Sequence, residues 1–232
     1  MTEELELGTA GFVEPRVSAE FPGLRLTWVT LPARLRESPR EVKRRLSALS
    51  NHYRGATVVA MRTKPVPHAY RAFFRQIGLD PDVSRIPSER AAVARLCQGE
   101  FHSEDLVRDA LLIALIETGV PVWALDADLV AGELGIRTTT SADTLSDQDS
   151  GVYLAPGRLA VADTDHVHAQ LFGDVARARE VSSRTTRIVL FAVGVDGVPA
   201  IAVQEALWAC VELLAAGERD PDQRADVAHP WW

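Results

Sequence analysis

The sequence predicts an α+β protein whose helices pack on a mixed, mainly antiparallel sheet or sandwich. Helical spacing of hydrophobic residues dominates the first half of the chain, and strand-like patterning dominates the second half before one last helix. With 232 residues, 47% of them hydrophobic, the chain is long enough to form one full core. Since it has no internal repeat, we expect one domain over residues 17–217, between a flexible lead-in at 1–16 and a tail at 218–232.

Three consecutive helices are expected in the first half. Hydrophobic residues recur at helical spacing over 68–78, and a second helix should begin at Pro87-Ser88-Glu89, with an acid in its first turn. A third helix follows Ser103, and its middle, residues 110–116, is apolar on every side. A helix without a polar face is a buried helix, so the rest of the domain should pack around it. Gly119 should end this helix, and an extended link should follow it.

The chain before these helices is expected to contain two strands, residues 17–21 and 24–31, joined by a turn. A basic amphipathic helix over 39–50 should follow, and then a stiff linker at 64–67. The basic positions of that helix are Arg40, Lys43, Arg44 and Arg45. They form either a solvated face on an acidic protein or a local patch that contacts RNA phosphates.

The second half of the chain is expected to form most of the sheet. Its candidate strands are residues 134–140, 151–154, 158–162, 167–172 and 187–195, separated by turn residues. The last of these strands is apolar from residue 188 onward and should be buried. An amphipathic helix over 200–216 should complete the fold.

The overall charge and the apolar runs limit the classes of function. The formal net charge is −7, which argues against broad electrostatic binding of nucleic acid but not against a local basic patch. The longest apolar runs are far shorter than a membrane span, and the first residues lack a signal peptide pattern. We therefore expect a soluble cytoplasmic protein that does not bind membranes. Cys97 and Cys210 are expected to be small buried hydrophobes rather than a disulfide or a reactive thiol.

Common catalytic motifs are missing from the sequence: it has no phosphate-binding glycine loop, no Cys-x-x-Cys and no Gly-x-Ser-x-Gly. The densest group of ligand-type residues is Asp163, Asp165, His166 and His168. Such donors on one strand could hold a divalent metal for a metal-dependent hydrolase. The alternative is an exposed turn with a pH-dependent charge pair.

Glu180 lies among arginines that include Arg177 and Arg179, just before the last predicted strand. A carboxylate in such surroundings stays ionised at neutral pH and could orient a substrate amine. It could equally form an ordinary surface ion pair. Thr185, in the same segment, belongs to a group of hydroxyl residues that more often form turns than act as nucleophiles.

Several motifs, in order, resemble the editing domain of the phenylalanyl-tRNA synthetase beta subunit (the B-three/B-four family). Gly119-Val-Pro-Val-Trp-Ala-Leu-Asp126, followed by Gly132 and Ile136-Arg137, is similar to that family's Gly-x-Pro-x-His-Ala-x-Asp, glycine and Val/Ile-Arg. The similarity extends over about residues 17–195. Its further matches are Phe21-Pro22-Gly23-Leu24, Arg71 through Gly78-Leu-Asp80-Pro81 to Pro87-Ser88-Glu89, Asp109, and Val181 through Thr185 to Ile188-x-Leu190.

The chain also departs from the family pattern at its amino-acid pocket. Trp123 stands where the family has a histidine, Leu112 where it has an asparagine, and Val175-Ala176 where it has a pair of glycines. The family's preference for tyrosine is therefore not carried over. Because Trp123 should narrow the pocket, we expect a small amino acid to be preferred over an aromatic one.

The resemblance implies an aminoacyl-tRNA deacylase that acts in trans on a mischarged tRNA, without cofactor or metal. In this interpretation Glu180 or Asp126 holds the α-ammonium group or the attacking water. Arg137 and Arg179 face the terminal phosphate or the ester. Thr185 supplies a hydroxyl. Trp123, Ser88 and Arg71 would complete the substrate site, and Arg40, Lys43, Arg44 and Arg45 would contact the RNA. The alternative is a non-catalytic module that binds tRNA or protein on the same scaffold.

Overall fold

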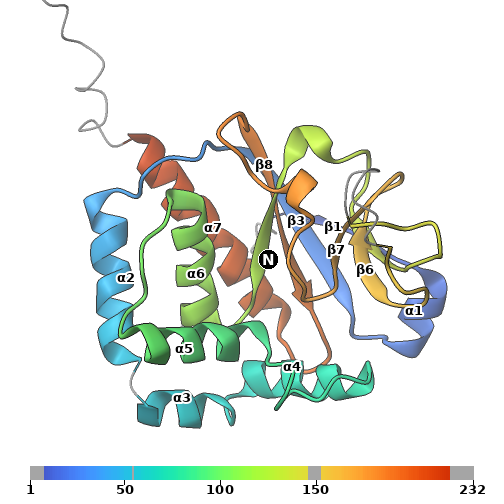
Figure 1. The fold of residues 1–232 in the computed structure, drawn as a ribbon, viewed down its shortest axis with the longest axis horizontal. Coiled ribbons are helices and arrows are strands. Elements are labelled where there is room, and N and C mark those ends of the chain that lie inside the picture. The colour runs from blue at the N-terminus through green and yellow to red at the C-terminus, as the bar shows by residue number, and fades with distance from the viewer. Residues whose placement is uncertain (1–7, 54, 146–152, 220–232) are drawn as a thin grey trace, which may run out of the picture.

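A computed structural model describes residues 8–53, 55–145 and 153–219, except for the side chains of 218 and 219. It confirms the α+β class: within these residues, helices pack against two four-stranded sheets that are mainly antiparallel (Figure 1). The helices are α1 (Pro15–Glu20), α2 (Arg40–His52), α3 (Gly55–Met61), α4 (Pro65–Gln76), α5 (Pro87–Gln98), α6 (Leu106–Thr118) and α7 (Ala200–Arg219), with short 3-10 turns η1 (Ala127–Leu129) and η2 (Arg177–Arg179).

The first sheet forms the centre of the molecule. Its order is β1 (Thr9–Ala10), β3 (Arg25–Pro32), β8 (Arg187–Gly194) and β4 (Val122–Asp126), and all neighbours are antiparallel. The central strand β8 is buried beyond its first residue, as its continuous apolar run predicts. The extended link expected after Gly119 is the edge strand β4, in which Trp123 pairs with Phe191 of β8.

The second sheet is smaller and has the order β2 (Phe12–Val13), β5 (Gly135–Thr138), β6 (Leu159–Ala162) and β7 (Val167–Gln170). The β2–β5 pair is parallel and the other pairs are antiparallel. It faces one side of the first sheet, while α6 and α7 cover the other side (Figure 1). The predicted strands at 134–140, 158–162 and 167–172 thus correspond to β5, β6 and β7, whereas residues 151 and 152 lie outside the described part.

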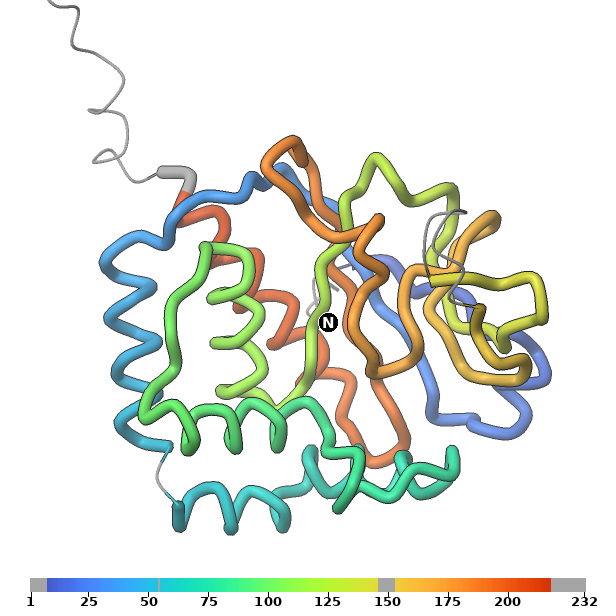
Figure 2. The backbone as a smooth tube through the Cα atoms, viewed as in Figure 1, coloured from blue at the N-terminus to red at the C-terminus, as the bar shows by residue number. Residues whose placement is uncertain are grey.

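The tube in Figure 2 shows α6 lying between α2 and α7, as expected for a helix without a polar face. Asp105 caps its start by accepting a 2.9 Å hydrogen bond from the backbone N–H of Arg108, and Gly119 ends it at φ +77°. One apolar side nevertheless remains open, because Leu111, Leu112 and Leu115 are only partly buried. This open side forms one wall of the groove described below.

Helix α7 is also apolar over much of its length. Residues Ala200–Gly217 are long and apolar enough to cross a membrane by length and composition alone. In the structure, however, Val203, Ala206, Leu207 and Cys210 of this helix are buried in the core. Their burial accounts for part of the hydrophobicity of α7, whereas Ile201 and Trp208 are exposed. Cys97, which was expected to be buried, is exposed on α5, and only the Cys210 prediction is confirmed.

Two predictions for the N-terminal half were wrong. Residues 17–21 do not form a strand; they belong largely to α1, which Pro15 initiates because its fixed φ suits the first helical turn. Residues 64–67 are not a linker, because Pro65 starts α4 in the same way. Within the lead-in expected at 1–16, residues 9–13 form β1 and β2, while residues 1–7 lie outside the described part.

Candidate functional site

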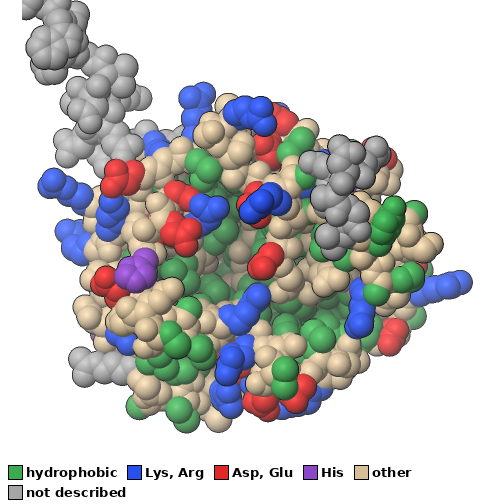
Figure 3. Space-filling view, viewed as in Figure 1, with side chains coloured by type: hydrophobic (Ala, Val, Ile, Leu, Met, Phe, Trp, Pro, Cys, Tyr) green, Lys and Arg blue, Asp and Glu red, His purple; other side chains and the backbone are tan. Residues whose placement is uncertain are grey.

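A hollow lies between α6, the edge strand β4 and the segment that follows β7, and we call it the α6–β4 groove. It consists of two adjoining pockets of about 260 and 240 Å³ that share Arg108, Leu111 and Trp123. Figure 3 shows hydrophobic side chains at the floor of the hollow face, with acidic and basic side chains at its edges. The larger pocket also has Leu35, Val107, Ala124, Asp174, Val175, Glu180 and Val181, and the smaller one Pro87, Leu112, Leu115, Pro121 and Val122.

Trp123 forms a fixed wall between the two pockets. Its ring stacks on Phe191 with centroids 5.3 Å apart and planes inclined by 10°, and it also contacts the ring of Phe172 at 6.0 Å. The indole Nε1 donates a 3.1 Å hydrogen bond to the carbonyl oxygen of Gly173. Because both the ring and its polar atom are engaged, the indole narrows the groove without filling it.

Glu180 lines the larger pocket together with Asp174. Both side chains lack a hydrogen bond or ion pair with any described residue. The one cation of the lining, Arg108, is already neutralised, because it lies 2.8 Å from the carboxylate of Asp105 and 3.4 Å from that of Glu104. The pocket therefore combines an apolar floor with two free carboxylates, which suits a ligand that carries an ammonium group.

The segment that carries Glu180 is attached at two points, to η1 and to the end of β4. On one side, the Arg179 guanidinium donates a 3.1 Å hydrogen bond to the carbonyl oxygen of Leu129. On the other side, the Thr185 hydroxyl donates a 2.5 Å hydrogen bond to Oδ2 of Asp126. Asp126, Arg179 and Thr185 do not line the pocket, so the geometry gives them a positioning role rather than direct contact with a ligand.

The structure does not bring Arg137, Arg71 or Ser88 to the groove. Arg137 lies on β5 and forms two 2.8 Å hydrogen bonds with Asp143, which hold the pKa of that carboxyl well below its usual range. Arg71 is buried between α4 and α5, where it binds both carboxylate oxygens of Glu89 at 2.8 and 3.0 Å. These arginines join elements of the fold. The Ser88 side chain is buried, and its hydroxyl has no hydrogen-bond partner in the described part of the chain.

The basic residues of α2 lie largely in ion pairs. Arg45 pairs with Glu117 of α6 at 2.6 Å, Lys43 pairs with Glu37, and Arg44 lies 3.8 Å from Glu41. Arg40 is exposed and forms no hydrogen bond or ion pair with a described residue. Contact between this helix and RNA stays a prediction.

In the cluster at 163–168, residues 164–166 form an exposed bend between β6 and β7, as one of the two interpretations expected, while Asp163 and His168 are not free metal ligands. Asp163 and His168 are buried, and Nε2 of the imidazole lies 2.9 Å from Oδ2 of the carboxylate. Although burial alone would raise the pKa of Asp163, backbone N–H groups of Ala131, Asp165 and His166 keep that pKa below its ordinary value. Among the described residues, no group of three or more His, Cys, Asp or Glu side chains could hold a metal ion.

Most groove residues were not singled out from the sequence as ligand contacts, among them Arg108, Leu111 and Asp174. The signal for Leu111 was present, because a helix that is apolar on all sides has more hydrophobic surface than its core neighbours need. Asp174 carries no such signal, since it is one acid in a loop whose path depends on the packing of β7. No family model matches the chain, and no curated protein matches it either.

Proposed function

We propose that this protein is a trans-acting deacylase that hydrolyses the ester of mischarged aminoacyl-tRNA. The observation that supports the proposal most strongly is that Trp123 and Glu180 line one pocket. Trp123 belongs to a stretch that resembles the synthetase editing domain, and Glu180 directly precedes another such stretch, which begins at Val181. The pocket also has the polarity that an aminoacyl group requires, with an apolar floor and two free carboxylates.

In the proposed complex, the α-ammonium group of the aminoacyl ester binds between Glu180 and Asp174. The amino-acid side chain lies against Leu111 and Val181, and Trp123 limits its size. A small pocket of this kind separates similar side chains by only about 1–3 kcal/mol, which is why editing by a second site is useful.

Hydrolysis requires a water molecule that attacks the ester carbonyl carbon. As the tetrahedral intermediate collapses, the bond to the ribose oxygen breaks and that oxygen takes up a proton. One carboxylate can hold the ammonium group while the other accepts the proton of the attacking water. Because an aminoacyl ester is already activated, holding the water and the ester in line supplies much of the acceleration.

A test of this proposal compares Glu180→Gln and Asp174→Asn with the wild-type chain in deacylation assays on mischarged tRNA. Glu133→Gln is a matched control, because Glu133 is exposed and lies outside the groove. We expect the first two variants to lose about 10²–10⁴-fold in rate, the range for a lost general base. Unchanged hydrolysis in both variants would contradict the proposal.

A non-catalytic tRNA-binding module is the second candidate function. It is favoured by the departures in the pocket, where Trp123 and Leu112 replace the histidine and asparagine of the resembled family. If the purified protein retains tRNA on a filter but leaves every mischarged tRNA intact, the second candidate is the better description.

A further inference from the structure

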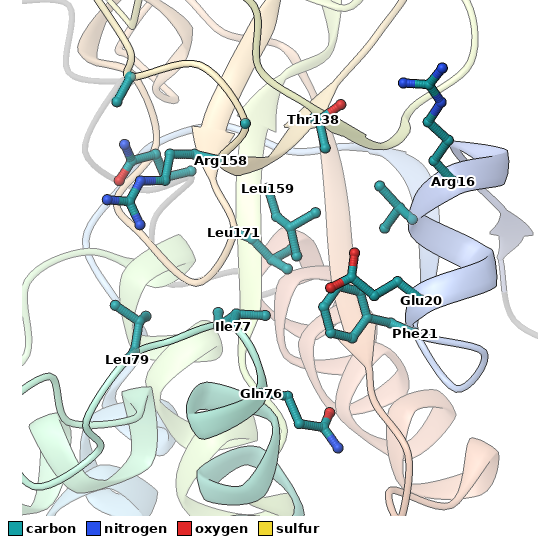
Figure 4. Close-up of a pocket in the computed structure, with 14 residues that line it drawn as sticks. Arg16, Glu20, Phe21, Gln76, Ile77, Leu79, Thr138, Arg158, Leu159 and Leu171 are labelled. Carbon is teal, nitrogen blue, oxygen red and sulfur yellow. The ribbon is translucent and has the colours of Figure 1, made fainter.

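A second cavity, of about 610 Å³, lies between α1, the end of α4 and the second sheet. It shares no lining residue with the α6–β4 groove. Figure 4 shows Leu159 and Leu171 at its centre, with Phe21 on one side and Ile77 on another. The cavity therefore has an apolar surface of its own, against which a flat ligand could lie.

The rim of this cavity carries polar side chains that have no partner within the described residues. Arg158 lies on one side of the apolar surface, while Arg16 and Glu20 of α1 lie on the opposite side (Figure 4). None of these three forms a hydrogen bond or ion pair through its side chain. Thr138 is different, because its hydroxyl and N–H both donate to Glu14 at 2.8 Å. Free charges around an apolar floor are a pattern typical of ligand sites.

The charges at the two sides differ in how they are balanced. Arg16 has two acids nearby on its own side of the cavity, Glu14 and Glu20. Arg158 lines the cavity just before β6, without an acid among the lining residues on its side. An anionic group is therefore expected at Arg158, and a hydrogen-bond donor at Glu20. The amide of Gln76, which is exposed at the lower edge in Figure 4, adds a donor and an acceptor.

We infer that this cavity binds a nucleotide whose base carries an exocyclic amino group. The phosphate contacts Arg158, the sugar and base lie over Leu159 and Leu171, and the base reaches Phe21. Its amino group donates to the carboxylate of Glu20, and the amide of Gln76 contacts the remaining polar edge of the base. Carboxylates accept hydrogen bonds from such amino groups, and amides read the donor and acceptor pairs of bases.

Such a nucleotide can be a free nucleoside monophosphate or the single-stranded end of an RNA. The chemistry of recognition is the same in both cases, since single-stranded bases are bound by stacking and edge contacts. The RNA source rests on the proposed function, in which the 3′ end of tRNA approaches the same molecule. The free nucleotide does not depend on that function.

The direct test is calorimetric titration of the full chain with AMP, UMP and adenosine. We expect saturable binding of AMP, and weaker binding of UMP because its base has no amino group. Arg158→Gln should weaken AMP binding about 10-fold, the effect of losing a charge-assisted hydrogen bond, and leave adenosine binding nearly unchanged. Glu20→Gln should reduce the preference for AMP over UMP. Arg187→Gln, an exposed arginine outside the cavity, is the control.

Competition between AMP and RNA distinguishes a site for a free nucleotide from a site for the end of an RNA. An RNA minihelix that carries no amino acid and ends in CCA should displace AMP if the site binds the end of an RNA. A minihelix without the CCA nucleotides should not displace it. AMP binding that no minihelix displaces assigns the site to a free nucleotide. Absence of saturable AMP binding, or equal AMP binding by wild type, Arg158→Gln and Glu20→Gln, would overturn the inference. Because these assays measure binding alone, failure of ester hydrolysis leaves their outcome unaffected.

Discussion

The hydroxyl of Thr185 donates a 2.5 Å hydrogen bond to Oδ2 of Asp126, and this bond joins the residues before β8 to the last residue of β4. The same hydroxyl accepts a 2.9 Å hydrogen bond from the N–H of Ser182. Oδ1 of Asp126 accepts from the N–H of Asp128 at 3.1 Å. Since Glu180 lies just before this network, Asp126 and Thr185 determine where its carboxylate is held in the groove.

The first prediction concerns this link. Thr185→Val keeps the shape of the side chain but removes the hydroxyl, leaving Asp126 without one of its donors. We expect the unfolding free energy to fall by about 1–3 kcal/mol, and the amide of Ser182, whose N–H donates to this hydroxyl, to exchange its hydrogen faster. Thr185→Ser retains the hydroxyl and should recover most of both effects. Chemical denaturation and hydrogen exchange measure the two quantities. Equal losses in the Val and Ser variants would show that the hydroxyl does not position the segment.

Asp109 provides the second prediction. Its buried carboxylate accepts hydrogen bonds from the hydroxyls of Ser38 and Ser103 at 2.6 and 2.5 Å, and from the N–H of Glu104 at 3.0 Å. It thus connects the segment before α2 to the start of α6. Asp109→Ala should lower the unfolding free energy by about 3–5 kcal/mol, because it leaves several buried donors unpaired. Ser103→Ala removes a single donor, and its loss should be clearly smaller. A loss in Asp109→Ala no larger than in Ser103→Ala would contradict this assignment.

The third prediction is a dependence of stability on pH that arises from His168. Burial lowers the pKa of this imidazole, and the neighbouring Asp163 carboxylate offsets the effect only in part. The Nδ1 atom has no hydrogen-bond partner among the described residues, so a protonated ring would bury an unpaired N–H. The folded state therefore binds the proton less well than the unfolded state. Stability is fully present above about pH 6.5, the ordinary histidine value, and decreases as the pH falls below it.

His168→Gln isolates this contribution, because it removes the titrating group. Between pH 7.5 and 5, the wild-type chain should lose stability with a slope of up to about 1.4 kcal/mol per pH unit from this residue. The Gln variant should lack that part of the slope, whatever its absolute stability. His68→Gln, which alters an exposed histidine, should titrate like the wild type. Urea denaturation at several pH values measures the slopes, and identical slopes in all three proteins would refute the prediction.

The fourth prediction concerns RNA contact by α2. Arg40 is free of described partners, whereas Arg45 is held by Glu117 through hydrogen bonds of 2.6 and 2.9 Å. If this helix contacts phosphates, Arg40→Glu should weaken tRNA association and reduce the salt slope by about one, the value for one lost phosphate contact. Filter binding over a range of salt concentrations measures both. An unchanged affinity and slope would assign α2 to a solvated face.

Sequence patterns predicted the secondary-structure elements and their burial best where the local pattern and the tertiary environment agree. The apolar run of β8 is buried, and so is most of that of α6, so their hydrophobicity indicated both position and element type. The strand prediction for residues 17–21 was wrong because the alternation of apolar and polar residues there suits a strand. The local structure is instead determined by Pro15, which starts a six-residue helix in which only Val17 is buried. Short elements carry too little periodicity to outweigh one residue with a fixed backbone angle.

Only part of the candidate site could be predicted from the sequence. Trp123 belongs to a stretch that resembles the family motifs and Glu180 directly precedes another, so their meeting in one pocket could be anticipated. Arg137 shares a motif with Trp123 but lies on another sheet, where it binds Asp143. Nothing in the linear sequence distinguishes an arginine that binds a substrate from one that binds an acid a few residues away. Asp174 and Arg108 depend on how the segment after β7 packs on α6, which only the fold determines.

The most direct test of the proposed activity is the deacylation rate of the wild-type chain on a panel of mischarged tRNAs. The panel should include small amino acids, such as alanine and serine, and aromatic ones, such as phenylalanine and tyrosine. With Trp123 as a fixed wall of the pocket, the account predicts faster hydrolysis of the small aminoacyl esters, and loss of that hydrolysis in Glu180→Gln. Preferential hydrolysis of the aromatic esters, or no hydrolysis of any ester in the panel, would contradict it.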